Sequence, residues 1–225
     1  MQFKKLAFLL LFLGFSSTAM AQMEIGIQFS PTIAGNRFIA EDRHGFEKNS
    51  NTLRVGVGVI GDYFFSNNYA FSSGLMYRSK GSKIKYNFTT ENPDGTPMTM
   101  PAEDDLTVQY LEIPITLKLF TNEVAPDVVL YFQVGGSLGA KVSGQVNNQK
   151  VINGEKTAKR FNVFETSAVL GTGAEMQLGQ STKLFGGITY LRGLSNIDNF
   201  YSDRLGDKNI SLKNNGVSID VGVKF

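Results

Sequence analysis

Apolar and polar residues alternate one by one over several stretches of this chain, and this period of two restricts its fold more than any other feature. In residues 53–59 the odd positions are Leu or Val and the even positions are Arg or Gly. Residues 111–119 repeat the pattern, with Leu and Ile separated by Glu, Pro, Thr and Lys. Side chains that alternate in this way lie on opposite faces of a β-strand, so each strand has one apolar and one polar face.

The pattern predicts about eight strands, with short turns and long polar loops between them. The strands are predicted at residues 23–34, 52–65, 69–87, 106–120, 128–143, 162–179, 183–194 and 212–225. The short turns are predicted at 66–68, 121–127 and 179–181, and the long loops at 35–51, 88–105, 144–161 and 195–211. Short turns at one end and longer loops at the other are typical of bacterial outer-membrane barrels, whose turns face the periplasm and whose loops face outward. We therefore predict an all-β fold, an eight-stranded antiparallel up-and-down transmembrane β-barrel with short periplasmic turns and four longer extracellular loops.

The composition of the polar face indicates which way the apolar face points. It carries acids and bases in similar numbers, interleaved with glycines: Glu24, Arg54, Asp62, Arg78, Lys80, Glu112, Lys118, Lys141, Glu165, Glu175, Asp220 and Lys224. Opposite charges can pair inside a narrow barrel, and Arg54, Arg78, Glu112 and Glu175 are expected members of a structural salt-bridge network. A soluble lipocalin-like barrel or a β-sandwich also alternates, but the predicted strands exceed the usual length of soluble strands. Aromatic residues near the strand ends, such as Tyr63 and Phe225, favour an interfacial girdle.

The first residues predict a secreted precursor. Lys4 and Lys5 precede an apolar run and the small-residue site Ala19-Met20-Ala21, the three-part pattern of a signal peptide. We expect residues 1–21 to be cleaved and residues 22–225 to form one barrel domain. Without the two lysines, 20 basic residues balance 20 acidic ones, so nothing favours a nucleic-acid partner. The chain has no cysteine, which excludes disulfides and a lipid-modified cysteine anchor.

Two segments resemble a known family. Residues 71–81 read Phe-Ser-Ser-Gly-Leu-Met-Tyr-Arg-Ser-Lys-Gly, and residues 110–115 read Tyr-Leu-Glu-Ile-Pro-Ile. Together with the glycine-rich strand at 131–140, they resemble the PorT-like outer-membrane β-barrel family over essentially the whole mature chain. The resemblance implies a bacterial outer-membrane location and the barrel fold. The alternating segment from Val217 to Phe225 looks like the signal read by the barrel-assembly machinery.

Few residues suggest chemistry. The single histidine, His44, lies near Glu41 and Asp42 and would need a serine and an orienting acid for acyl transfer, but no motif supplies them. We interpret it as a solvated loop residue. Gly171-Thr172-Gly173 lies within a predicted strand, where its glycines fit the barrel interior better than a phosphate loop. Glu103-Asp104-Asp105 lacks the spacing of a calcium loop and is interpreted as a solvated loop base.

We therefore predict no catalytic residues, no metal site and no cofactor. The expected function is that of a non-catalytic barrel with a polar, plugged lumen, because eight strands enclose only enough room for their own side chains. Its external loops would bind a protein partner or brace the envelope, and its other partners would be outer-membrane lipids and the assembly machinery. A rim-active lipid-modifying enzyme using His44, a narrow channel or secretion-associated barrel, and a soluble lipocalin-like binding barrel remain alternatives.

Overall fold

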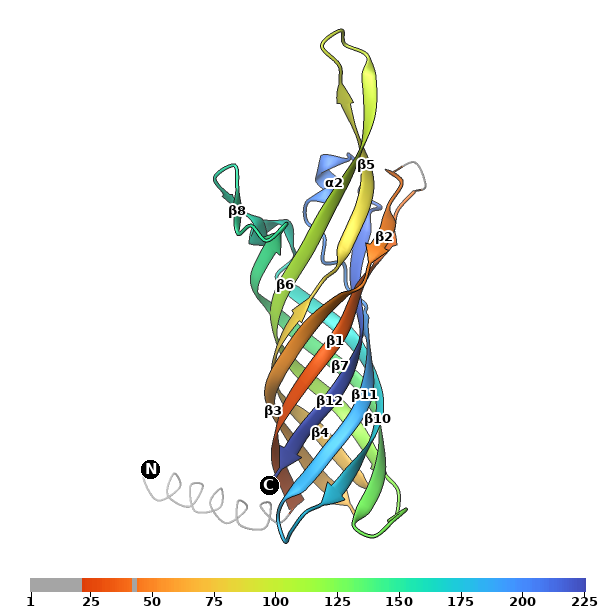
Figure 1. The fold of residues 1–225 in the computed structure, drawn as a ribbon, viewed down its shortest axis with the longest axis vertical. Helices are drawn as coiled ribbons and strands as arrows, with labels where there is room; N and C mark the ends of the chain where they lie inside the picture. The colour runs from red at the N-terminus through yellow and green to blue at the C-terminus, as the bar shows by residue number, and fades with distance from the viewer. Residues whose placement is uncertain (1–21, 42–43) are drawn as a thin grey trace, which may run out of the picture.

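Eight strands close a ring in the computed structural model, which describes residues 22–41 and 44–225. The ring strands are β1 (Met23–Ile39), β3 (Thr52–Ser66), β4 (Tyr69–Lys80), β6 (Pro97–Phe120), β7 (Val128–Val146), β10 (Phe164–Gln177), β11 (Lys183–Gly193) and β12 (Ser211–Lys224). Each strand pairs antiparallel with its neighbours in chain order, and β1 pairs with β12 to complete the circle. Figure 1 shows the strands winding obliquely around the barrel. The predicted up-and-down ring is confirmed, whereas the predicted signal peptide lies outside the described residues.

The apolar face points outward and the charged face points into the lumen. Leu53 is 69% exposed and Ile27 is 59% exposed, whereas Glu112 and Lys224 are almost completely buried. This arrangement is the reverse of a lipocalin-like barrel, which keeps its apolar side chains inside. The soluble alternative is therefore wrong for this chain. Among the described residues, no helix is long and apolar enough to cross a membrane.

Three short connections lie at one end of the barrel, which we call the turn end. They join Ser66 to Tyr69, Phe120 to Val128 and Gln177 to Lys183, as the turn-forming residues predict. The opposite end, which we call the loop end, holds the long connections. In Figure 1 the turn end is at the bottom, where the C-terminus lies.

The predicted strand at 69–87 and the predicted loop at 88–105 are both wrong in detail. The chain bends at Gly81, whose φ of 105° is unfavourable for other residues, and a new strand β5 (Lys83–Glu91) begins two residues later. A Cβ on Gly81 would lie 2.2 Å from the carbonyl oxygen of Leu106. Strand β6 begins at Pro97, inside the predicted loop, and pairs with β5. Residues 88–101 are largely exposed, so no alternation marked them as strands.

The other predicted loops also contain short elements. They are β2 (Glu47–Ser50), which pairs with β5, the hairpin of β8 (Val151–Ile152) and β9 (Glu155–Lys156), the 3-10 helix at Thr157–Arg160, and α2 (Tyr201–Arg204). Strands β1 and β7 extend beyond their predicted ends, to Ile39 and Val146. The loop end is therefore built mostly of ordered elements that continue the barrel wall.

Candidate functional site

Paired charges fill the lumen near the turn end. The side chain of Asp62, on β3, accepts hydrogen bonds from Lys118 Nζ at 2.9 Å and Lys224 Nζ at 2.5 Å. Lys224 also contacts Glu175 on β10. All four side chains are at least 95% buried. Two bases and two acids from four strands thus neutralise one another in a space from which bulk water is excluded.

A second charged cluster lies closer to the loop end. Arg78 Nε is 3.3 Å from Glu112 Oε2, and Lys80 Nζ is 2.5 Å from Glu112 Oε1. Lys80 also pairs with Glu165 at 3.3 Å, and Asn214 donates a hydrogen bond to the same carboxylate. As in the first cluster, each carboxylate has a cationic partner, which is the condition for burying charge at tolerable cost.

The four network members named from the sequence all lie in the lumen or at its rim, but they do not all pair with one another. Arg78 does pair with Glu112. Arg54 instead pairs with Asp105 at 2.9 Å, and Glu175 pairs with Lys224. The alternation identified which side chains face inward, whereas the pairing depends on the stagger between strands.

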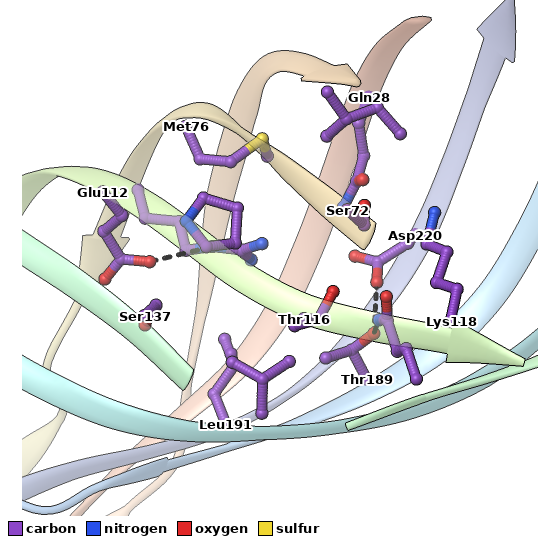
Figure 2. A pocket seen from close by; sticks show the side chains of 15 residues that line it. Gln28, Ser72, Met76, Glu112, Thr116, Lys118, Ser137, Thr189, Leu191 and Asp220 are labelled. Atoms are coloured by element: carbon purple, nitrogen blue, oxygen red, sulfur yellow. Dashed lines mark hydrogen bonds and ion pairs between the residues drawn. The ribbon is translucent and has the colours of Figure 1, made fainter. Parts of the chain in front are cut away.

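A cavity of about 40 Å³ lies between the two charged clusters. Its lining includes Arg78, Gln133, Thr189 and Asp220, and Figure 2 shows Thr189 and Asp220 joined by a hydrogen bond in this lining. Thr189 Oγ1 donates to Asp220 Oδ2 at 2.6 Å and accepts from Gln133 Nε2 at 2.8 Å. A space of this size holds about one or two water molecules.

Apolar side chains close the lumen at both ends. At the turn end Phe120 and Tyr131 pack with Phe64 and Ala70. At the loop end a larger core forms from strands and loops together: Ile84, Tyr86, Leu106, Val108, Tyr110, Val146, Phe161, Ile197, Tyr201, Ile210 and Leu212. We call this group the loop-end core. The lumen is therefore polar in the middle and apolar at each end.

Asp104 is buried at the edge of the loop-end core. It accepts hydrogen bonds from Tyr201 Oη at 2.6 Å, Tyr86 Oη at 3.3 Å and Asn147 Nδ2 at 3.0 Å. Burial, together with the charge of Asp104, raises the pKa of Tyr86 to about 12 and also raises the pKa of Tyr201 well above its usual value. The interpretation of Glu103-Asp104-Asp105 as a solvated loop base is wrong for Asp104, because this carboxylate ties three loop segments together.

His44 is also buried, so its interpretation as a solvated residue is wrong. Its Nε2 lies 3.0 Å from Asp207 Oδ2, which joins the first long loop to the last. A histidine and an acid are two parts of a hydrolytic triad, and the third is a hydroxyl within hydrogen-bond reach of the imidazole. Within residues 22–41 and 44–225, no hydroxyl is hydrogen-bonded to His44. The pair connects two loops, and the described residues give it no nucleophile.

The glycines at 171–173 face the crowded interior, as predicted. A Cβ on Gly171 would lie 2.6 Å from Gln133 Nε2, and one on Gly173 would lie 2.6 Å from the Tyr131 ring.

The described residues contain no group of three or more His, Cys, Asp or Glu side chains arranged to hold a metal ion.

The chain's family follows from a comparison with protein-family models. The model described as "Outer membrane protein beta-barrel domain" matches residues 15–199. The chain belongs to this family. Its location is the bacterial outer membrane, and the exposed apolar belt of the barrel is the surface that meets lipid. No curated protein sequence matches the chain.

Solved structures with a similar arrangement are also outer-membrane proteins. Neisserial surface protein A is 14% identical, with a TM-score of 0.44 over 89% of this chain and 97% of that chain. OprG from Pseudomonas aeruginosa is 11% identical, with a TM-score of 0.46 over 89% and 95%. The outer membrane protease OmpT from Escherichia coli is 11% identical, with a TM-score of 0.49 over 90% and 96%. At these levels of similarity none of them indicates what this barrel does.

The sequence interpretation missed the loop-end core. Ile197, Tyr201 and Ile210 lie in a predicted polar loop, yet each is nearly completely buried. Their spacing follows neither a strand nor a long helix, so periodicity gave no signal. The presence of several large apolar residues within a loop was the available clue, because a loop that stays in water gains nothing from them.

Proposed function

We propose that this protein is a non-catalytic outer-membrane barrel that binds a protein partner through its loop end. The observation that carries the proposal is the contrast between the two parts of the molecule. The lumen is filled by paired charges and closed by apolar side chains, whereas an ordered hairpin extends well beyond the rest of the loop end. A barrel of this kind offers a surface for recognition and little space for transport.

The hairpin consists of β5 and the first part of β6, residues 83–105, and we call it the loop-end hairpin. Its strands pair from Lys83 with Asp105 to Glu91 with Pro97. The described part of β6 pairs with β7 only from Leu106 onward, so one edge of the hairpin is unpaired. Met98 and Met100 are both about two-fifths exposed on it. Exposed methionines and a free strand edge are features that peptide-binding surfaces use.

The tip of the hairpin is fixed in shape. Asn92 donates its backbone N–H to Thr96 O at 2.8 Å, and Gly95 supplies the positive φ that the turn requires. The side chain of Asp94 accepts hydrogen bonds from the backbone N–H and the hydroxyl of Thr96, which lower its pKa. A preformed tip loses less conformational entropy on binding than a flexible one.

The experiment places a photo-crosslinking amino acid at Met100 and compares it with the same substitution at Val151, an exposed residue of the β8–β9 hairpin. The proposal predicts a discrete heavier adduct from outer membranes of the Met100 variant and a much weaker one from the Val151 variant. Equal labelling at the two sites, or labelling of lipid alone, contradicts it.

The alternatives have less support. A narrow channel requires a continuous path, and the cavity between the charged clusters holds about one or two water molecules. A lipid-modifying enzyme requires a nucleophile beside His44, and the described residues place none there. Membership of the PorT-like group, with a link to secretion, rests on the segments at 71–81 and 110–115 and would be compatible with partner binding at the loop end.

A further inference from the structure

Three cationic side chains lie on adjacent strands on the outside of the barrel. Arg37 on β1 is directly opposite Lys213 on β12, and Arg192 on β11 is directly opposite Asn215, two residues along β12 from Lys213. All three occupy outward positions, because their chain neighbours Asn36, Leu191, Leu212 and Asn214 are buried in the barrel. We call them the cationic triplet.

The triplet lies in the loop-side part of the apolar belt, and Ile39 and Leu194 are exposed apolar residues on its loop side. The nearest large apolar outward residues on its turn side are Ile33, Val217 and Tyr190, which are between 38% and 55% exposed. Tyr190 pairs with Val217, and Arg192 is the next outward residue on β11. Tyrosines of this kind mark the membrane interface in barrels, so the side chain two residues further reaches the headgroup layer.

The charges of the triplet are not neutralised within the described chain. Among the residues that the structure describes, Arg192 and Lys213 have no salt-bridge partner. Arg37 donates one hydrogen bond, from Nη2 to the Gly193 carbonyl oxygen at 3.3 Å. The Nε of Arg37 is buried and has no hydrogen-bond partner. Like charges directly opposite each other on a sheet are unfavourable, and a buried donor without an acceptor adds a further cost. An anion between the strands would relieve both costs.

Four of the five remaining ring strands carry no charge at the corresponding height. Their outward residues next to the belt are Ser79 on β4, Gln109 on β6, Ala140 on β7 and Thr166 on β10. An unspecific attraction to a charged membrane surface would be served by cations spread around the barrel. The grouping on β1, β11 and β12 instead fits one compact anion at one place.

We propose that the cationic triplet binds the phosphate of an outer-leaflet lipid. The loop end faces outward in bacterial outer-membrane barrels, which sets the triplet at the height of the outer-leaflet phosphates. The acyl chains then lie along Ile33, Val217 and Tyr190, while two guanidinium groups and one ammonium group contact the phosphate. Arginine suits this contact because its planar donors match phosphate oxygens.

The test compares two variants of the full barrel that lose three positive charges each. One carries Arg37→Gln, Arg192→Gln and Lys213→Gln, and the control carries Lys150→Gln, Lys156→Gln and Lys208→Gln, which alter exposed loop residues. Each purified protein is titrated in detergent with bisphosphorylated lipid A, with the same lipid after removal of its phosphates, and with inorganic phosphate. The readout is the temperature at which the protein loses its compact mobility on an unheated gel.

Bisphosphorylated lipid A should raise this temperature in the wild type and the control. The triplet variant should need about tenfold more lipid to reach half of its maximal temperature rise, since charge-assisted contacts are lost. Identical titrations of the triplet variant and the wild type overturn the proposal. An equal rise in this temperature with the dephosphorylated lipid also overturns the proposal. An equal rise with inorganic phosphate shows an adventitious ion only and overturns it as well. If the triplet variant does not fold, Lys213→Gln alone provides the comparison, with about a threefold weaker response expected.

Discussion

The ammonium group of Lys224 lies 2.5 Å from the Oδ2 of Asp62, so a residue at the end of β12 is fixed to β3 across the intervening strand β1. Lys224 also contacts Glu175 on β10. One buried side chain thus connects three strands that are far apart in sequence. The contact ties the place where the ring closes to the rest of the wall.

Replacement of Lys224 with methionine should destabilise the barrel by about 3–5 kcal/mol, because the buried carboxylate of Glu175 would lose its cation. The free energy of unfolding, measured by urea titration in lipid vesicles, provides the test. Lys208→Met removes an exposed lysine and should change stability by less than about 0.5 kcal/mol. Equal stability of the two variants would contradict the assigned role of Lys224.

Two adjacent glycines of β11 should differ in how well they tolerate substitution. A Cβ on Gly187 would lie 2.3 Å from the hydroxyl oxygen of Tyr131 inside the lumen, whereas one on Gly186 would lie 3.9 Å from its nearest neighbour, on the lipid side. We expect Gly187→Val to reduce the yield of folded barrel severalfold and Gly186→Val to leave it nearly unchanged. The folded fraction on unheated gels measures both. A well-folded Gly187→Val protein would show that Tyr131 does not fill the lumen as described.

The loop-end core should loosen in alkali. The pKa of Tyr86 is about 12 in the folded protein, above the value near 10 of an exposed tyrosine. Its contribution to stability is therefore complete below pH 10 and is lost as the pH rises from about 10 to 12, because the unfolded segment releases its proton first. Protease cleavage of the loops should accelerate over this range. Tyr86→Phe should make the cleavage rate less dependent on pH over this range. Tyr190→Phe, which alters a tyrosine on the lipid side, should not. The same pH profile in the wild type and both variants would contradict the role assigned to Tyr86.

Loss of the His44 imidazole should weaken the loops without affecting lipid chemistry. His44→Ala removes one hydrogen-bond partner of the buried Asp207 carboxylate and the contact between the first and last long loops, so we expect faster proteolysis of the loop end, corresponding to about 1–3 kcal/mol. Asp207→Asn should produce a smaller effect in the same direction. The lipid profile of the outer membrane should be identical in wild type and variant. A changed profile would restore the enzyme hypothesis.

The barrel could be predicted from the sequence because its two faces meet different surroundings. Lipid outside and paired charges inside impose a strict alternation, visible in residues 53–59 and 111–119. The chain from Thr89 to Thr99 is largely exposed on both sides, so neither face selects apolar residues. Residues 88–105, which form most of the loop-end hairpin, were therefore predicted as a loop.

Side-chain pairings and loop contacts could not be predicted from the sequence, for a different physical reason. Asp104 and Tyr201 are 97 residues apart, and their hydrogen bond exists only because β6 and α2 are brought together by the ring. The same holds for His44 and Asp207, which are 163 residues apart. Alternation determines the face of a residue and leaves its partner on that face undetermined.

The proposed closed lumen is best tested by recording the current through the purified wild-type protein in a planar lipid bilayer. Folding is first verified by gel mobility before and after boiling. We expect a silent bilayer over the usual range of voltages, because open aqueous barrels have about sixteen or more strands, whereas the ring of this barrel has eight and side chains fill its interior. Reproducible conductance steps from the folded protein would contradict it.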